Sequence, residues 1–227
     1  MQEKSTNEYI RTSKGKNDEC YTHRYAVEPL LEFLKAHKEK RRSASQGNFN
    51  NSLAPAPAPL IIWCPFDTEE SEFVKVLKEN GYKVIYSHID YGQDFYKYEP
   101  EHFDLIISNP PFTNKTKMFK RILSFNKPFA ILMSVLYLND GTPYSLFKDI
   151  DLQLLLFPKR MTFKGQTYTN KINFMSCYFC KDFLPKQIIF RDFVRSVPIG
   201  QVHHLPDFHT GTATNTNQLN LFKEGEQ

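Results

Sequence analysis

From Leu60 onward, short apolar runs alternate with segments of helical spacing, and few architectures accommodate such an alternation. The apolar runs span residues 60–64, 83–89, 103–108, 129–135 and 152–157, and helical segments are expected over 70–80, 116–125 and 144–149. Strands that are apolar on both faces are typical of a parallel sheet that helices cover on both sides. The sequence therefore predicts an α/β fold with a doubly wound, mostly parallel sheet.

The chain before Leu60 divides into three parts by composition. Residues 1–19 are polar and are expected to form a disordered arm. A helix is expected from about Arg24, and Pro29 lies either inside it or in its first turn. Residues 38–59 run from basic to Ser/Asn/Gly-rich to alternating Ala-Pro, which is typical of a flexible spacer. Because the segment before the spacer is too short to fold alone, we interpret the spacer as an insertion within one domain.

The pattern changes after the fifth apolar run. Arg160–Phe163 and Phe174–Cys180 are expected to form an antiparallel pair joined by a polar loop, within a hairpin and target-recognition region over 157–190. Residues 203–227 are rich in Thr and Asn and are expected to be disordered. The sequence thus predicts one domain over 20–200 that ends in a short C-terminal β-hairpin region.

Charge and cysteine content favour an intracellular protein. The chain carries 29 Lys+Arg against 25 Asp+Glu, a formal net charge of +4, which mildly favours a nucleic-acid partner. Its 4 cysteines lack disulfide-framework spacing, and no apolar stretch approaches the roughly 20 residues needed to span a bilayer. We therefore expect a cytoplasmic protein with no membrane partner. Cys177 and Cys180 should point to opposite faces of a strand, so no metal site is expected there.

The sharpest motif, Ser108-Asn109-Pro110-Pro111-Phe112, directly follows the third apolar run. Ligands of doubly wound sheets bind at the carboxyl ends of the strands, which is where this loop is expected. The Asn109 side-chain oxygen and the Pro110 carbonyl could accept hydrogen bonds from an amino group, the two prolines fix the backbone, and Phe112 offers a ring for stacking. The alternative is a simple rigid turn after a strand, since Asn-Pro commonly starts turns.

Residues 104–112 resemble the catalytic motif of the amino-methyltransferases that act on adenine, the (D/N/S)PP(Y/F/W) family. The resemblance implies the seven-stranded, Rossmann-like class I methyltransferase sheet, S-adenosylmethionine as the cofactor, and catalytic roles for Asn109, Pro110, Pro111 and Phe112. Residues 157–163, with the later strands, are similar to small bacteriophage-type DNA adenine methyltransferases. A bacterium or a bacteriophage-infected cell is the setting that this resemblance implies.

Other segments resemble the family's cofactor-binding segments in the expected order. Residues 18–27 resemble the segment that caps the cofactor, with His23 where proline is usual, and residues 63–67 resemble the loop after the first strand. An acidic residue that binds the ribose often follows the second strand, and residues 92–95 resemble the stretch that contacts the cofactor adenine. The cofactor candidates that this resemblance implies are Tyr21, Thr22, Pro65, Phe66, Asp67, Asp90 and Asp94. At least one of the last two is expected to be a ligand, and the other is then a solvated loop acid.

The first loop departs from the family pattern, which has a leading acid and glycines that let the backbone approach the cofactor. Here Cys64 stands in place of the acid, and residues 68–71 replace the glycines. Either Asp67 supplies the missing carboxylate or cofactor binding is weakened. A third interpretation is that Asp67 or Thr68 caps the following helix.

Two further sets of residues suggest contacts with DNA and with a protein. Lys159, Arg160, Lys164 and Lys171 surround the predicted hairpin and either meet phosphates or form an ordinary charged face. Residues 218–222 resemble the pentapeptide with which bacterial proteins dock on the replication sliding clamp, through Gln218, Leu219, Leu221 and Phe222. The alternatives for this segment are chance or a short strand that packs back on the domain.

The predicted function is therefore methyl transfer from S-adenosylmethionine to the N6 amino group of adenine in DNA. Two other hypotheses stay open. The same loop also serves enzymes that act on RNA bases or on protein glutamine. A catalytically degenerate nucleic-acid-binding module of the same fold would explain the missing glycines.

Overall fold

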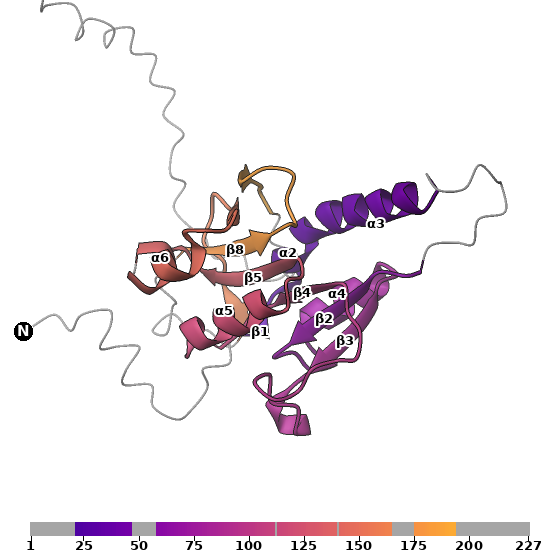
Figure 1. The fold of residues 1–227 in the computed structure, drawn as a ribbon, viewed down its shortest axis with the longest axis horizontal. Helices are drawn as coiled ribbons and strands as arrows, with labels where there is room; N and C mark the ends of the chain where they lie inside the picture. The colour runs from indigo at the N-terminus through magenta and orange to yellow at the C-terminus, as the bar shows by residue number, and fades with distance from the viewer. Residues whose placement is uncertain (1–20, 47–57, 112, 140, 165–174, 194–227) are drawn as a thin grey trace, which may run out of the picture. The chain divides into compact units, whose positions relative to one another are not determined.

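A seven-stranded sheet organises the computed structural model, which describes residues 21–46, 58–111, 113–139, 141–164 and 175–193 (Figure 1). The strands follow the order β3-β2-β4-β5-β8-β6-β9. Their bounds are Ile61–Pro65 (β2), Lys83–Ser87 (β3), Leu105–Ser108 (β4), Phe129–Ser134 (β5), Gln153–Leu156 (β6), Ser176–Lys181 (β8) and Ile188–Phe190 (β9). Only β8 runs antiparallel to its neighbours in this sheet, so the predicted α/β fold with a mostly parallel, Rossmann-like sheet is confirmed.

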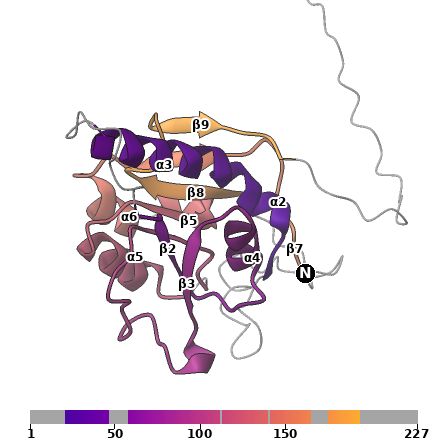
Figure 2. The ribbon, with the colours of Figure 1, turned by 90° about the vertical axis from the view of Figure 1, so that its right-hand side faces the viewer.

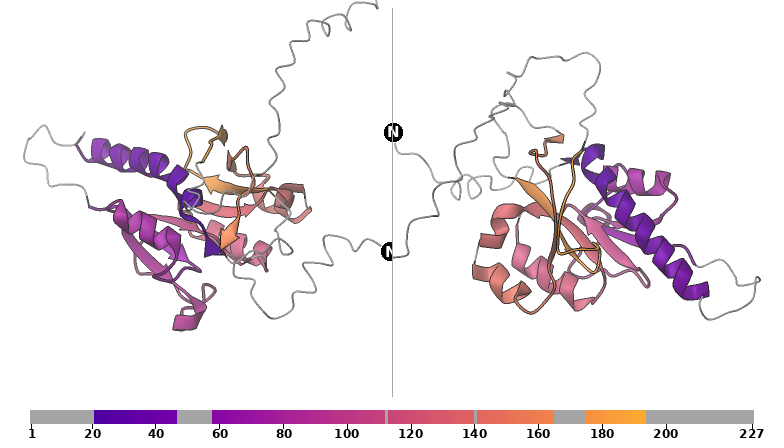
Figure 3. Two further views of the ribbon diagram at one scale, coloured as in Figure 1. Left: turned by 180° about the vertical axis from the view of Figure 1, so that it is seen from behind. Right: turned by 90° about the horizontal axis from the view of Figure 1, so that it is seen from above.

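Helices cover both faces of the sheet, as Figure 3 shows in its right-hand view. One apolar cluster joins the sheet to α2 (Arg24–Val27), α3 (Leu31–Gln46) and α4 (Glu72–Glu79). The other joins it to α5 (Lys115–Ser124), the 3-10 helix η3 (Val135–Asn139) and α6 (Gly141–Phe147). Successive strand residues alternate between the two clusters, because a strand points neighbouring side chains to opposite faces. Cys180 belongs to the first cluster and Cys177 to the second, which confirms their predicted opposite orientation.

The N-terminal helical segment is longer than expected. After α2, a 3-10 turn, η1 (Glu28–Leu30), contains Pro29, and α3 then continues to Gln46. The prediction that the flexible spacer begins at residue 38 is therefore wrong. Lys, Glu, Arg and Ala in residues 38–46 are good helix formers, and Arg41 forms an ion pair of 2.6 Å with Asp104 on the sheet side. Figure 2 shows α3 in front of β8, and residues 47–57 lie outside the described residues.

The predicted C-terminal hairpin does not form as expected. β7 (Phe163–Lys164) pairs antiparallel with β1 (Tyr21–Thr22), while β8 lies in the main sheet between β5 and β6. The physical reason is burial: residues of β8 from Ser176 to Cys180 are buried on both faces, and a surface hairpin would leave one face in water. A hydrogen bond also joins α2 to the residue before β7: the Tyr25 hydroxyl accepts it from the Thr162 backbone N–H at 2.8 Å.

The connection from β3 to β4 packs rings rather than a helix against the sheet. It begins with a 3-10 turn, η2 (Ile89–Tyr91), and places Phe95, Tyr98 and Phe103 around Trp63. The indole N–H of Trp63 donates to the Ser87 hydroxyl at 3.0 Å, so the buried ring also has its polar partner. This packing explains much of the aromatic content in the middle of the chain.

The hydroxyl of Tyr178 on β8 donates to the Ala26 carbonyl of α2 at 2.7 Å inside the core. Replacing Tyr178 with Phe leaves that carbonyl without this donor, so we expect the free energy of unfolding to fall by about 1–2 kcal/mol. Urea denaturation followed by circular dichroism measures the change. Tyr144→Phe is the matched control, because Tyr144 is largely exposed. Equal stability of Tyr178→Phe and wild type would contradict a stabilising role for this bond.

Candidate functional site

The Asn-Pro-Pro loop lies at the carboxyl edge of the parallel strands, where the sequence predicts it. β4 ends at Ser108, and Asn109, Pro110 and Pro111 follow without regular structure. Pro110 is buried, while Asn109 and Pro111 are partly exposed. Phe112, the predicted stacking residue, lies outside the described residues. The described part of the loop thus presents a polar side chain on a backbone that two prolines restrict.

A hydrogen bond joins Asn109 to the N-terminal segment. The Asn109 Nδ2 donates to the Thr22 Oγ1 at 3.1 Å, and Thr22 itself is buried on β1. Because the nitrogen faces Thr22, the Asn109 Oδ1 is the atom that can accept a hydrogen bond from a substrate. β1 is held in turn by its pairing with β7, in which Tyr21 lies opposite Lys164. Two segments that the sequence assigned to one site are therefore in contact.

A second set of hydrogen bonds joins the first loop to the end of β4. The Ser108 hydroxyl lies within hydrogen-bond distance of the Pro65 carbonyl and, at 2.5 Å, of the Asp67 Oδ2. The Ser71 hydroxyl also bonds to the Asp67 carboxyl, which is only 5% exposed. α4 begins later, at Glu72, with Ser71 in the cap position. Asp67 therefore bonds to Ser108 rather than to the first turn of the helix, and its predicted capping role is wrong, as is that of Thr68.

Burial raises the pKa of Asp67 to about 7, although hydrogen bonds from Ser108 and Ser71 oppose the shift. The bonding pattern agrees with a protonated acid. A single hydroxyl proton on Ser108 cannot serve both the Pro65 carbonyl and an ionised carboxylate. Ser108 Oγ is placed as the donor to both the Asp67 Oδ2 and the Pro65 carbonyl, so these two acceptors compete for one proton. Protonation of Asp67 would relieve this competition, because the acid could then donate to Ser108. The acid then acts as a neutral link beneath the Asn109 loop.

The first loop reaches a left-handed conformation without a glycine. Phe66 has φ of 72°, a value that bulky residues rarely adopt and that costs on the order of 1–3 kcal/mol. Its ring packs against Phe95 with centroids 4.6 Å apart, which helps to hold the strained backbone. Strain of this kind is concentrated at functional sites.

The two other acidic candidates follow β3 at the same edge of the sheet. Asp90 lies in η2 with its carboxylate exposed, beside the His88 ring at 3.2 Å. Asp94 is partly buried and accepts a hydrogen bond of 3.0 Å from the Tyr96 backbone N–H, which is a local turn interaction. Of the two, Asp90 has the more accessible carboxylate.

The predicted DNA-binding and clamp-binding residues are only partly described. Lys159 forms an exposed ion pair of 3.2 Å with Asp192, and Arg160 is exposed. Lys164 is placed by its backbone in β7. Lys171 and the tail residues Gln218, Leu219, Leu221 and Phe222 lie outside the described residues. The described part of this basic set is thus partly neutralised by an acid.

Sequence reasoning missed two features of this edge. The motif includes Ser108, but no function was predicted for its hydroxyl. Its position at the end of a buried strand, next to a polar loop, is the signal that could have suggested a buried hydrogen bond. The cationic character of the helix after the loop was also missed, although the sequence shows it directly. Between Asp104 and Asp140 the chain carries Lys115, Lys117, Lys120, Arg121 and Lys127 and no carboxylate.

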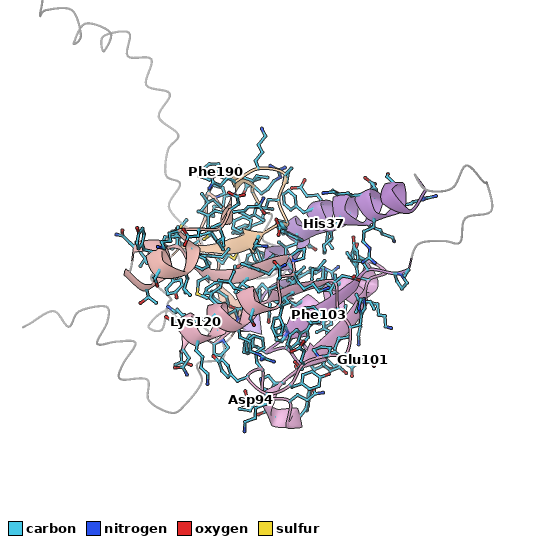
Figure 4. The ribbon with its side chains drawn as sticks, viewed as in Figure 1. His37, Asp94, Glu101, Phe103, Lys120 and Phe190 are labelled. Atoms are coloured by element: carbon cyan, nitrogen blue, oxygen red, sulfur yellow. The ribbon has the colours of Figure 1, made fainter. Side chains whose placement is uncertain are left out.

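The described residues offer little support for a metal site or a membrane span. No group of three or more His, Cys, Asp or Glu side chains there could hold a metal ion, and none of the helices described could cross a membrane. A cavity of about 360 Å³ lies near Glu101, Phe103 and Arg121, where β4 and β5 begin. It is therefore at the opposite edge of the sheet from Asn109, and Figure 4 labels Glu101 and Phe103 beside it.

Comparison of the chain with protein-family models found no match, and comparison with curated proteins found none either. Any functional conclusion must therefore come from the residues of this edge and their geometry.

The stability of the fold should depend on pH through Asp67. Its pKa of about 7 in the folded state lies above the ordinary 3.8, so the folded protein binds an extra proton between those values. The free energy of unfolding should therefore fall as pH rises from about 4 to 7, by at most about 4 kcal/mol. Asp67→Asn keeps a donor to Ser108 and cannot ionise, so it should remove this part of the slope and be more stable than wild type at pH 8.

Urea denaturation of wild type and Asp67→Asn at several pH values tests this expectation. Cys64 and Tyr178 face the same buried space, and burial raises the pKa of each well above its ordinary value, so neither ionises in this range. Asp90→Asn, an exposed acid, is the control and should keep the wild-type slope. Parallel pH curves for wild type and Asp67→Asn would show that folding does not raise the pKa of Asp67 and would overturn this expectation.

Proposed function

We propose that this chain is an S-adenosylmethionine-dependent methyltransferase that modifies the N6 amino group of adenine in DNA. The observation that carries the proposal is the hydrogen bond from Asn109 to Thr22 at the carboxyl edge of the sheet. It joins the loop that resembles the catalytic motif to the segment that resembles the cofactor cap. Ser108 joins the same loop to Asp67 in the third segment of the resemblance.

The residues at this edge fit the cofactor in part. The exposed carboxylate of Asp90 follows β3, a position that suits ribose hydroxyls. Asp94 and Thr22 flank the same edge, whereas Asp67 is covered and offers its hydrogen bonds to the protein. Bound there, S-adenosylmethionine would supply an electrophilic methyl group. Phe66 and Pro65 would then shape the pocket, and Asp67 would support it from below.

The chemistry assigned to the loop is activation of a weak nucleophile. The adenine amino group is delocalised into its ring and attacks poorly. Acceptors for its two protons, the Asn109 Oδ1 and the Pro110 carbonyl, would raise the electron density on nitrogen as the new N–C bond forms and the bond between the methyl carbon and the sulfonium sulfur breaks, with its electron pair left on the sulfur. One amino proton is then lost to solvent or a nearby acceptor. The prolines hold both acceptors before the substrate arrives, so little reorganisation accompanies the reaction.

DNA and the sliding clamp are the proposed macromolecular partners. An adenine must leave the duplex to reach a loop of this kind, and Phe112 is the proposed ring for stacking the flipped base. The segment of Gln218, Leu219, Leu221 and Phe222 would tether the enzyme to newly copied DNA by raising its effective concentration there.

Specific observations favour each of the two alternative functions, a module without cofactor binding and a methyltransferase with another substrate. The strained, glycine-free loop at Phe66 and the covered carboxylate of Asp67 favour a module that has lost cofactor binding. The loop geometry alone also suits an RNA base or a protein glutamine, because each offers a planar amino group. The substrate and cofactor experiments below separate these functions.

Tritiated methyl transfer to unmethylated duplex DNA, followed by nucleoside analysis, tests the proposed reaction. Asn109→Ala should lower kcat by about 100-fold or more, because it removes one aimed acceptor. Asn109→Asp keeps an acceptor and should retain more activity. Cofactor binding by calorimetry should change little in both variants. Methylation of RNA or protein instead of DNA would overturn the substrate assignment, and absence of cofactor binding would favour the degenerate module.

Thr22 should affect the same reaction through the orientation of Asn109. Thr22→Val removes the acceptor for the Asn109 Nδ2 at nearly constant volume, so this hydrogen bond no longer orients the amide. We expect kcat to fall about 10-fold, which corresponds to one neutral hydrogen bond. Thr22→Ser restores the hydroxyl and should recover most of the activity. Equal kcat values for the Val and Ser variants would exclude this positioning role.

A further inference from the structure

The helix that follows the Asn-Pro-Pro loop carries cations where helices usually carry acids. α5 begins at Lys115, and its first turn contains Lys117 and no acidic residue. Cations at a helix N-terminus oppose the helix dipole and cost stability. Lys117 and Lys115 lie over the rings of Tyr96 and Tyr137, at 4.2 Å and 5.4 Å from the ring centroids. The two charges are therefore held close to the loop at some cost to the helix.

Beside α5, the segment after β5 exposes large apolar side chains. Tyr137 and Phe147 point inward and pack on Phe119, with ring centroids 5.8 Å and 5.0 Å apart. Leu136 is 60% exposed and Tyr144 is 72% exposed, on η3 and α6 respectively. Leu138 is also exposed, at 37%. Water is an unfavourable environment for such a group of side chains, which is typical of an interaction surface.

This apolar group lies beyond the same strand ends as Asn109. Ser108 of β4 pairs with Ile131 of β5, and β5 then continues to Ser134 before η3 begins. Three further strand residues add about 10 Å in the direction of the carboxyl edge. Figure 1 shows β5 pointing toward α6. η3 and α6 therefore stand beside and beyond the Asn109 loop.

We propose that α5, η3 and α6 form the surface on which duplex DNA lies, with Lys115 and Lys117 meeting phosphates and Leu136 and Tyr144 contacting the base pairs next to the extruded adenine. This inference rests on the proposed function and adds the substrate-binding face to it. Apolar side chains that enter a base step compensate for lost stacking. Lysines contribute the sequence-independent attraction to the backbone.

The positive charge of this surface favours DNA over a second copy of the chain as its binding partner. Lys115 and Lys117 give the start of α5 a positive charge with no acid in its first turn, and two copies of this face would repel each other. Two other exposed apolar pairs lack this setting. Ile89 and Tyr91 on η2 flank the exposed carboxylate of Asp90. Ile188 and Phe190 on β9 are followed by Arg191, which is paired with Glu32. Figure 4 labels Phe190 over β9 and Lys120 over α5, on different parts of the surface.

Fluorescence anisotropy with a labelled adenine-containing DNA duplex, without cofactor, tests the surface. The double variant Lys115→Gln/Lys117→Gln should bind about 10-fold more weakly and reduce the slope of log K against log salt by about 2, one unit for each phosphate contact. The double variant Leu136→Ala/Tyr144→Ala should also weaken binding several-fold. It should reduce the fluorescence rise of a duplex that carries 2-aminopurine at the target position. Ile188→Ala/Phe190→Ala is the matched control and should match wild type, and thermal melting confirms that each variant is folded.

The outcomes separate this inference from the proposed function. DNA binding that the surface variants weaken, in a protein that transfers no methyl group, supports the surface and overturns the enzyme. Methyl transfer by a wild type whose surface variants bind and react unchanged overturns the surface and leaves the enzyme. Loss of a dimer in the surface variants, measured by sedimentation, would assign the face to a second copy and overturn the proposal.

Discussion

The geometry of the candidate site depends on one hydroxyl group. Ser108 ends β4 and bonds to the carbonyl of Pro65, the last residue of β2, and to the carboxyl of Asp67, which follows β2. Because β2 and β4 are parallel neighbours, their carboxyl ends meet, and a single short side chain can join them. Asn109 is the next residue, so its backbone position is set by this junction, and its side chain is set by Thr22. A shift of Ser108 would move every polar atom assigned to catalysis.

Sequence reasoning was most reliable where burial alone decides the structure. Continuous apolar runs such as Phe129–Ser134 must be covered on both faces, and this requirement predicted the parallel sheet and its helices. The partner of β8 was predicted wrongly, because an apolar run shows that a strand is buried but not which distant strand lies beside it. The basic residues before Gln46 were assigned to a spacer, because a solvated helix end and a linker have similar compositions and the ion pair of Arg41 with Asp104 is not visible locally.

The same distinction between what the sequence predicts and what it does not applies to the candidate site. The motif and its place after a strand predicted the Asn109 loop at the carboxyl edge, and the order of the resembling segments predicted that Thr22 and Asp67 would lie nearby. The raised pKa of Asp67 could not be predicted, because it depends on how completely the folded chain excludes water from one carboxyl. The same holds for Phe66, because the packing of its ring on Phe95, a distant residue, helps to hold its left-handed backbone.

A neutral Asp67 favours the proposed cationic surface, and burial, which raises the pKa of Asp67 to about 7, favours the neutral form. An ionised Asp67 directly beneath the loop would place a negative charge under the site at which a polyanion is proposed to bind, and low polarity around it would strengthen the repulsion. A proton on Asp67 removes that charge and keeps the hydrogen bonds that hold Ser108. α5 then presents Lys115 and Lys117 in its first turn, next to the loop. The burial that shifts the pKa of Asp67 therefore has two consequences. It helps to fix the loop, and it reduces a negative charge that would oppose the cationic surface.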